Sequence, residues 1–265
     1  MKINERKING IVYTPKWIVN LILDEVGYKN DIYGKRIIDP ACGNGAFLIE
    51  VLKRFLTDVK KTNLSQEEIK DMLEKNIIGF DIDNQAINEC ISNLNNVALK
   101  YNLKNIKWQI IKTDSLNKSF VSQYFNSFDF VVGNPPYIRI QHLGRERRKN
   151  IQNDWYCCKN GSTDIFITFF ELGFSLLNKN GQLGYITPNT YLKTNAGESL
   201  REFIKISKSL KTLIDFEYYQ LFKNTTTYSI ITILDKNHHK NTFSLYKSDG
   251  KNINYIDDIN INNLD

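Results

Sequence analysis

The chain has 265 residues, of which 42% are hydrophobic, and its 35 Lys+Arg against 29 Asp+Glu give a formal net charge of +6. This length allows one large α/β domain or two small ones, and the mild positive charge suits a polyanionic partner without establishing one. No segment approaches the roughly 20 apolar residues that span a bilayer, and residues 1–11 lack the apolar stretch of a signal peptide, so we expect neither membrane insertion nor secretion.

The first 55 residues alternate helical and strand patterns. Thr14 is expected to cap a helix whose first residue is Pro15 and whose apolar side chains lie on one face. Residues 35–39 have the pattern of a short buried strand, and the tight turn at 40–45 leads into an amphipathic helix over 47–55. This order of strand, turn and helix is typical of a ligand-binding turn.

The middle of the chain continues this alternation after a polar excursion over residues 57–76, in which Ser65 and Glu68 form a capping box for a short exposed helix. The elements predicted next are a strand, a helix and two strands, over residues 77–81, 83–101, 106–112 and 128–132. Helices that alternate with strands in this way predict a doubly wound, mostly parallel α/β sheet.

Beyond residue 138 we expect a long polar loop over 139–162 and then a return to regular structure. The predicted elements are helix, strand, helix, strand and strand, over residues 163–177, 181–186, 198–207, 210–216 and 228–234. Residues 242–247 are a candidate to pair with the last of these strands. The Asn- and Lys-rich residues 236–265 are interpreted as a linker or the start of a second domain.

The stretch most informative about chemistry is the exit from the strand at 128–132, where Asn134, Pro135, Pro136 and Tyr137 follow one another. Proline has no N–H donor and a fixed φ, so the chain must leave the sheet here in a stiff turn. In an α/β sheet, ligands bind at the carboxyl ends of the parallel strands. The turn therefore predicts one wall of an active site.

Three acids follow three successive strands: Asp39, Asp81 and Asp114. Any one of them has roughly even odds of being only a turn former or helix cap, but three in order predict a common crevice. Gly43 and Gly45 let the backbone come close to a ligand and adopt positive φ. The third glycine of a dinucleotide fingerprint is absent, and an acid in the turn suits a cationic ligand better than a pyrophosphate, so NAD is disfavoured.

The amide of Asn134 cannot ionise near neutral pH, so it is no general base, and its oxygen is an acceptor. Together with the Pro135 carbonyl it would hold both hydrogens of an –NH2 group and direct the nitrogen lone pair at an electrophile. Tyr137 would stack on a planar substrate, an interaction worth about 1–3 kcal/mol for a base.

The polar loop contains a basic run in which Arg139, Arg145, Arg147 and Arg148 are candidates to contact the backbone of a nucleic acid. A solvated charge run is an equally weighted interpretation. The four cysteines include no C-x-x-C pair and no zinc-type spacing with histidine, which predicts a reduced, cytoplasmic chain without a metal site.

Taken in order, the motifs at residues 12–15, 39–48, 81–83, 114–115 and 134–137 resemble the gamma-class N6-adenine DNA methyltransferases. The chain is similar in particular to the modification portion of type IIG restriction-modification enzymes, from about Gly10 to Leu234. The resemblance implies the class I S-adenosyl-L-methionine (SAM)-dependent methyltransferase fold, with a seven-stranded, mostly parallel sheet. It implies a catalytic domain over 1–235, with 236–265 as a linker or the start of a missing target-recognition domain.

The same resemblance implies SAM as the methyl donor and assigns residues to it. Thr14 and Asp39 would lie near its methionine part, Asp81 at the ribose hydroxyls, Ile82 against the adenine face and Asp114 at the adenine amine. The remaining implied cofactor-binding residues are Tyr13, Ala41, Gly43 and Gly45.

The target side of the implied site consists of the catalytic turn, Asn134, Pro135, Pro136 and Tyr137. Tyr137 would stack on a flipped adenine, since a base inside a duplex is unreachable. Phe222 would pack on or beside that base, with Tyr228 as the nearby alternative.

The implied partner is DNA, together with a separate specificity subunit or a missing C-terminal domain that recognises the target. An RNA adenine methyltransferase and a protein glutamine N-methyltransferase remain alternatives, although the Tyr13-Thr14-Pro15 motif favours nucleic-acid enzymes. A SAM-binding subunit that only scaffolds a partner is a further alternative. It would predict loss of Asn134 or Tyr137, and both are present.

Overall fold

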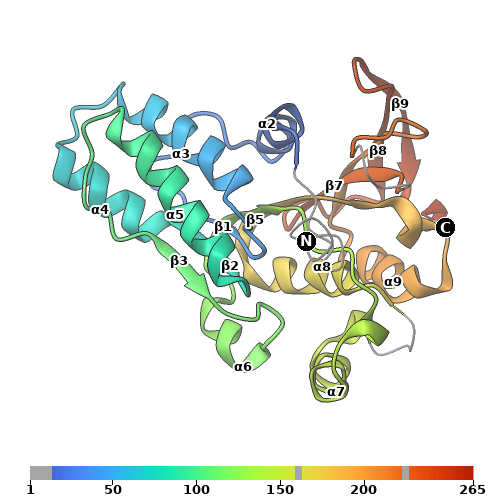
Figure 1. The fold of residues 1–265 in the computed structure, drawn as a ribbon. Helices are drawn as coiled ribbons and strands as arrows, with labels where there is room; N and C mark the ends of the chain where they lie inside the picture. The colour runs from blue at the N-terminus through green and yellow to red at the C-terminus, as the bar shows by residue number, and fades with distance from the viewer. Residues whose placement is uncertain (1–13, 159–162, 223–226, 265) are drawn as a thin grey trace.

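A computed structural model describes residues 14–158, 163–222 and 227–264 of the chain (Figure 1). Within these residues the strands form one nine-stranded sheet in the order β3-β2-β1-β4-β5-β7-β6-β8-β9. The strands are β1 Ile37–Asp39, β2 Ile77–Asp81, β3 Gln109–Lys112, β4 Phe128–Gly133, β5 Leu177–Pro188, β6 Leu210–Asp215, β7 Ser229–Asp235, β8 Thr242–Ser248 and β9 Ile253–Asn260. The helices are α2 Lys16–Glu25, α3 Ala46–Val59, α4 Gln66–Asn76, α5 Asn84–Leu99, α6 Lys118–Val121, α7 Arg145–Asp154, α8 Ile165–Leu176 and α9 Glu198–Ser207.

The sheet is covered on both faces, as a doubly wound fold requires. Neighbouring strand residues point to opposite sides, so that Ile37 joins the hydrophobic core under α2, α3, α4 and α5 while Ile38 joins the core under α8 and α9. In Figure 1 these two helical layers lie above and below the sheet. The predicted α/β class is confirmed. Strands with apolar side chains on both faces need a layer of helices on each face to bury them.

The predicted strand count is corrected from seven to nine, but the sheet is mostly parallel as predicted, because only β7 and β9 run opposite to the other strands. Strands β3, β2, β1, β4 and β5 run parallel, but β7 is antiparallel to both of its neighbours. Because β7 lies between β5 and β6, residues 242–247 cannot pair with it. Strand β8 instead adds parallel to β6, and β9 pairs antiparallel with β8.

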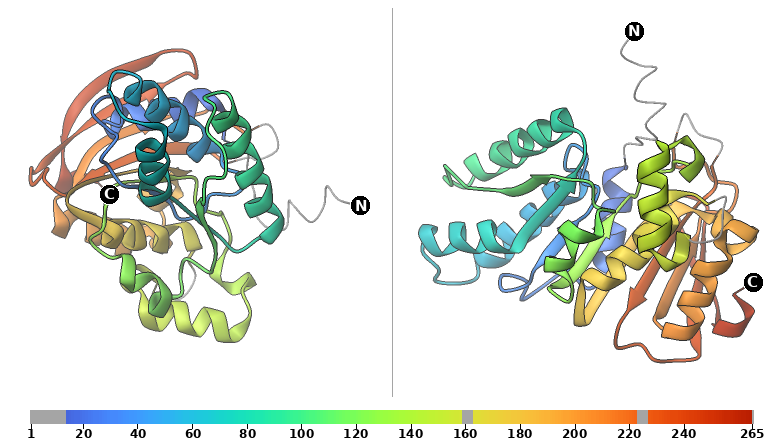
Figure 2. Two further views of the ribbon diagram at one scale, coloured as in Figure 1. Left: turned by 90° about the vertical axis from the view of Figure 1, so that its left-hand side faces the viewer. Right: turned by 90° about the horizontal axis from the view of Figure 1, so that it is seen from below.

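Half of the segment 236–265 therefore belongs to the sheet, since Thr242–Ser248 and Ile253–Asn260 extend it by two strands. Figure 2 shows these strands, in orange and red, at the end of the sheet far from α4 and α5. The domain boundary at residue 235, and a following target-recognition domain, stay predictions.

The expected loop over 139–162 is also corrected, because residues 145–154 within it form α7. This helix is hard to predict because its sequence, RERRKNIQND, has almost no apolar face. Its one buried residue is Ile151. The predicted capping box of Ser65 and Glu68 at the start of α4 is confirmed.

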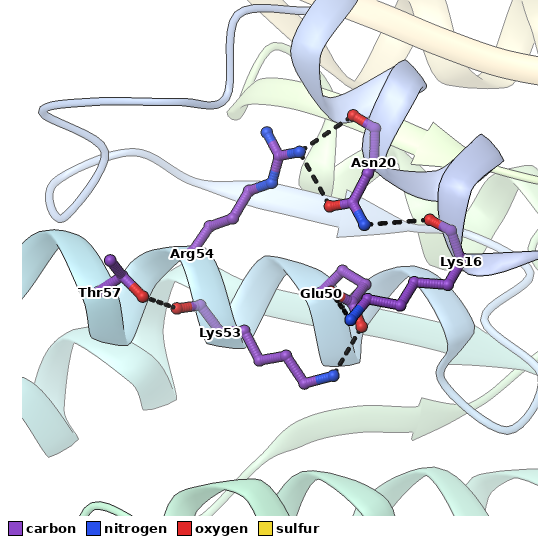
Figure 3. A network of polar contacts seen from close by, with 6 residues as sticks. All are labelled: Lys16, Asn20, Glu50, Lys53, Arg54 and Thr57. Carbon is purple, nitrogen blue, oxygen red and sulfur yellow. Dashed lines mark hydrogen bonds and ion pairs between the residues drawn. The ribbon is translucent and has the colours of Figure 1, made fainter.

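Helix α2 is fixed to α3 by a polar network (Figure 3). The guanidinium of Arg54 donates to the backbone oxygen of Asn20 at 3.0 Å, to its side-chain oxygen at 2.9 Å and to Asp24 at 2.9 Å. Glu50 pairs with Lys53 at 2.7 Å and with Lys16 at 3.8 Å, at the first residue of α2. The network holds the amino end of α2, and with it Thr14, over the carboxyl edge of the sheet.

None of the described helices is long and apolar enough to cross a membrane. All four cysteines are buried free thiols.

Candidate active site

The residues predicted to form the site lie at one edge of the sheet. Asp39 and Asp81 are the last residues of β1 and β2, and Asp114 and Asn134 follow the ends of β3 and β4. These four strands are parallel neighbours, so their carboxyl ends meet at the same edge. The structure thus brings the three acids and the amide to the same edge of the sheet.

The turn after β1 is shaped by two glycines with positive φ, Gly43 at 52° and Gly45 at 90°. The Gly43 N–H donates to Asp81 at 2.8 Å, and the other carboxylate oxygen of Asp81 accepts from the Asp83 N–H at 2.9 Å. Asp81 therefore connects the end of β2 to the glycine turn that joins β1 to α3. The free N–H groups at the start of α3 face the same edge.

Replacing Gly45 with alanine should destabilise the fold and weaken ligand binding at the turn. Its φ of 90° disfavours any side chain, and an added Cβ would lie 2.7 Å from the Cys90 sulfur. We expect a loss of about 1–3 kcal/mol in the free energy of unfolding, measured by urea titration. Gly34→Ala is the matched control because a Cβ there meets nothing within 4 Å. An equal loss in both variants would contradict this account.

Asp39 is an almost fully buried acid, with 1% of its surface exposed. Burial, with a smaller contribution from the charge of Asp81, raises its pKa to about 8, although the hydrogen bond from the Ala41 N–H at 3.0 Å opposes the shift. A Cβ on Gly133 would lie 2.7 Å from a carboxylate oxygen of Asp39. The acid therefore lies directly against the residue before Asn134.

Thr14 does not cap α2, which corrects the predicted N-cap. Pro15 is the N-cap, and no side chain donates or accepts a capping hydrogen bond there. The buried Thr14 hydroxyl instead accepts a hydrogen bond from the Asn134 amide nitrogen at 3.0 Å. This contact fixes the orientation of the amide, so its carbonyl oxygen points to the opposite side of the group.

Tyr137 is held by contacts behind the catalytic turn. Its hydroxyl donates to the Ile186 carbonyl at 3.4 Å, and its ring meets the edge of Phe166 with centroids 6.2 Å apart. Burial raises the pKa of this hydroxyl well above its ordinary value, so Tyr137 stays neutral. Its role in base stacking stays a prediction.

The two candidates for the second stacking ring differ in exposure. Phe222 is packed in the hydrophobic core with 4% exposed, whereas Tyr228 is 41% exposed and meets the edge of Tyr218 at 5.8 Å. The difference favours Tyr228 as the ring that a base can reach, while the role of Phe222 stays a prediction.

Ile82 lies just beyond β2 with 56% of its surface exposed. An exposed isoleucine beside the acid that ends β2 offers an apolar surface to a flat ring, as the resemblance implies. Pro135 is buried and Pro136 is half-buried. Tyr13 lies outside the described residues.

Asp114 has a partner that the sequence patterns did not indicate. Its two carboxylate oxygens accept from Arg147, from Nε at 2.6 Å and from a terminal nitrogen at 3.1 Å.

The other arginines of the basic run differ in exposure: Arg139 and Arg145 are exposed and Arg148 is half-buried. Contacts of all four arginines with a nucleic-acid backbone stay predictions. No group of His, Cys, Asp and Glu in the described part of the chain is arranged to hold a metal ion.

The strand order 3-2-1-4-5-7-6 with an antiparallel β7, a glycine turn after β1 and an acid that ends β2 define the class I methyltransferase fold. Residues 35–222 match the family described as Eco57I restriction-modification methylase. The chain belongs to this family.

Two relatives and one solved structure illustrate the similarity. The chain is 30% identical to "Type II restriction enzyme and methyltransferase RM.Eco57I" of Escherichia coli, over 89% of this chain and 29% of that protein. It is also 30% identical to "Type II methyltransferase M.BstVI" of Geobacillus stearothermophilus, over 88% of this chain and 43% of that protein. The structure of the type I restriction enzyme EcoKI M protein superposes with a TM-score of 0.70 at 15% identity, over 92% of this chain and 50% of that one.

The chain thus spans less than half the length of these two relatives. The low identity to the EcoKI M protein means that this superposition concerns the fold alone.

Proposed function

We propose that the chain transfers a methyl group from SAM to the N6 amino group of adenine in DNA, with the base flipped out of the duplex, as the modification part of a restriction-modification system. The observation that carries the proposal is the Asn134 amide, fixed by Thr14 at the end of β4 and next to the buried Asp39. Membership of the Eco57I restriction-modification methylase family supports it.

The residues of the crevice fit SAM. Gly43 has a φ of 52° and open space where a Cβ would be, so backbone can lie against a ligand there. Asp39 suits the cationic methionine end, Asp81 the ribose hydroxyls and the exposed Ile82 the adenine face. When bound, SAM supplies an electrophilic methyl group on a positively charged sulfur.

Asn134 would prepare the acceptor nitrogen. The lone pair of an amino group on an aromatic ring is delocalised, so the nitrogen is a weak nucleophile until it becomes more tetrahedral. Its two hydrogens would be donated to the Asn134 side-chain oxygen and the Pro135 carbonyl oxygen. Preorganised acceptors of this kind stabilise the charge that develops on the nitrogen without having to reorient.

DNA as the substrate is supported by the match to the restriction-modification methylase family and by a relative that is named as both a restriction enzyme and a methyltransferase. Adenine as the target base is proposed from the Asn134–Pro135 turn and its resemblance to the N6-adenine enzymes. A neutral Tyr137 beside the turn suits stacking on a base. We also propose that a separate specificity subunit or a further domain supplies target recognition.

The proposal is tested by offering methyl-tritiated SAM with unmethylated genomic DNA, with RNA or with a release-factor protein, followed by hydrolysis and chromatography of the product. We expect label in DNA, as N6-methyladenine. Label in protein, in RNA alone or at another base position would overturn the proposal. A candidate specificity subunit is added in a parallel reaction.

A further inference from the structure

Helix α7 is anchored to the loop after β3 mainly at its carboxyl end. Trp155, directly after the helix, is fully buried, and its indole N–H donates to the Leu116 carbonyl at 2.9 Å. The Lys118 ammonium donates to the Asp154 carbonyl at 2.6 Å and lies 5.0 Å from the centre of the Trp155 ring. These contacts leave the amino end of α7 less firmly attached.

The amino end of α7 is held by the ion pair between Arg147 and Asp114. The N-cap Gly144 contributes no side-chain hydrogen bond. Among the described residues, Arg147 is the one residue in the first turn of α7 that forms an ion pair. Its side chain is 36% exposed and that of Asp114 is 26% exposed, so a ligand or water can reach the pair. A cleft of about 500 Å³ lies between the loop after β3 and the length of α7 from Glu146 to Asp154, and the ion pair lines it.

The hydrogen bonds of Asp114 decide which partner a ligand would displace. One oxygen accepts from the Leu116 N–H at 3.1 Å and from Arg147, and the other accepts from Arg147 alone. The Leu116 N–H belongs to the backbone of the loop and cannot leave. An amino group that binds Asp114 must therefore compete with the guanidinium of Arg147.

The exposed side of α7 gives Arg147 an alternative partner. Arg145, Arg148 and Lys149 do not line the cleft that Arg147 faces but lie on the rest of the helix surface, and none of the three forms an ion pair with another described residue. Such a group of cations attracts phosphates of a nucleic acid, and a guanidinium binds phosphate with the same fork that it presents to a carboxylate.

We propose that Arg147 couples nucleic-acid binding on α7 to cofactor binding at Asp114. This inference rests on the proposed function. Arg147 holds Asp114 until a phosphate on α7 draws the guanidinium away, after which Asp114 accepts from the adenine amine of the cofactor. By thermodynamic reciprocity, the cofactor then strengthens nucleic-acid binding by the same factor. Arg147 is in this account a positioning residue that acts through Asp114.

The test measures the affinity for S-adenosylhomocysteine by calorimetry, with and without a short duplex. This probe has a neutral thioether in place of the sulfonium of SAM. Without DNA, we expect Arg147→Gln to bind the probe roughly three- to tenfold more tightly than wild type, as removal of a partly exposed ion pair allows. With DNA, the affinity of wild type should rise by a similar factor and that of Arg147→Gln should not. Arg148→Gln is the matched control, which should bind DNA more weakly but keep the wild-type probe affinity.

A second probe, S-inosylhomocysteine, has no amine to place on Asp114, so Arg147→Gln should bring no gain with it. Thermal unfolding verifies that each variant is folded. Unchanged or weaker probe binding by folded Arg147→Gln, or a DNA effect that persists in it, would overturn the coupling while leaving the proposed function intact. Failure of wild type to bind S-adenosylhomocysteine would instead overturn the proposed function and this inference with it.

Discussion

Replacing Asn134 with alanine should lower methyl transfer by about 10²–10³-fold, the usual loss when one preorganised polar group at the reacting atoms is removed. The amide oxygen makes its contribution as charge develops on the acceptor nitrogen, so the loss should appear in kcat. Affinity for S-adenosylhomocysteine should stay within about twofold because Asn134 interacts with the acceptor rather than the cofactor. Single-turnover transfer of tritium and calorimetry measure the two quantities.

Thr14→Val provides the graded companion to this variant. It keeps the shape of the side chain but removes the acceptor that holds the Asn134 amide at 3.0 Å. We expect an intermediate loss of about tenfold, equivalent to one hydrogen bond of ordinary strength. Full transfer by Asn134→Ala, or an equal loss of cofactor affinity, would show that Asn134 is not the acceptor-binding group.

Local sequence patterns predict those elements of the fold whose stabilising contacts are between residues close together in the sequence. Helix α9 covers Glu198–Ser207 as predicted, and the capping box at Ser65 begins α4. Both depend on contacts within one turn of helix. The partner of β8 could not be predicted, because period-two alternation identifies a strand but not its neighbour. Helix α7 was missed since its packing depends on one buried side chain, Ile151.

The site divides in the same way. Asp39, Asp81 and Asn134 could be placed at one edge because each follows a strand, and parallel strands end together. The contacts that orient these groups join residues far apart in sequence. Thr14 and Asn134 are 120 residues apart, and Asp114 and Arg147 are 33 apart. The local sequence around Thr14 predicts a helix cap, because capping is the commoner use of threonine before a helix.

Replacing Asp39 with asparagine should stabilise the protein and weaken cofactor binding at the same time. Burial raises the pKa of Asp39 from 3.8 to about 8, so the folded chain keeps a proton that the unfolded chain loses as pH rises above 4. The folded state is therefore penalised progressively as pH rises from about 4 to about 8, and the penalty no longer grows above pH 8. Asparagine keeps the acceptor oxygen for the Ala41 N–H and has no proton to lose.

We expect Asp39→Asn to exceed wild type by about 1–3 kcal/mol in the free energy of unfolding at pH 8. The difference should shrink toward zero as pH falls below the ordinary pKa of 3.8, where the acid is protonated in both states. Urea titrations at several pH values measure it. Asp83→Asn is the control: Asp83 is an exposed N-cap that accepts from the Gln85 N–H at 2.8 Å, and asparagine caps equally well. Asp83→Asn should therefore leave the free energy of unfolding close to that of wild type.

The cost of the same substitution should appear in binding. A cationic ligand favours the ionised form of Asp39, so wild type should release a proton as it binds SAM and should bind more tightly as pH rises toward 8. Asp39→Asn should bind about 10- to 100-fold more weakly and lose this pH dependence. Calorimetry in buffers of different ionisation enthalpy counts the released proton. A variant that is less stable than wild type at pH 8, or binding without proton release, would show that Asp39 is already ionised in the fold, and the burial penalty would then have to be offset by a partner other than the Ala41 N–H.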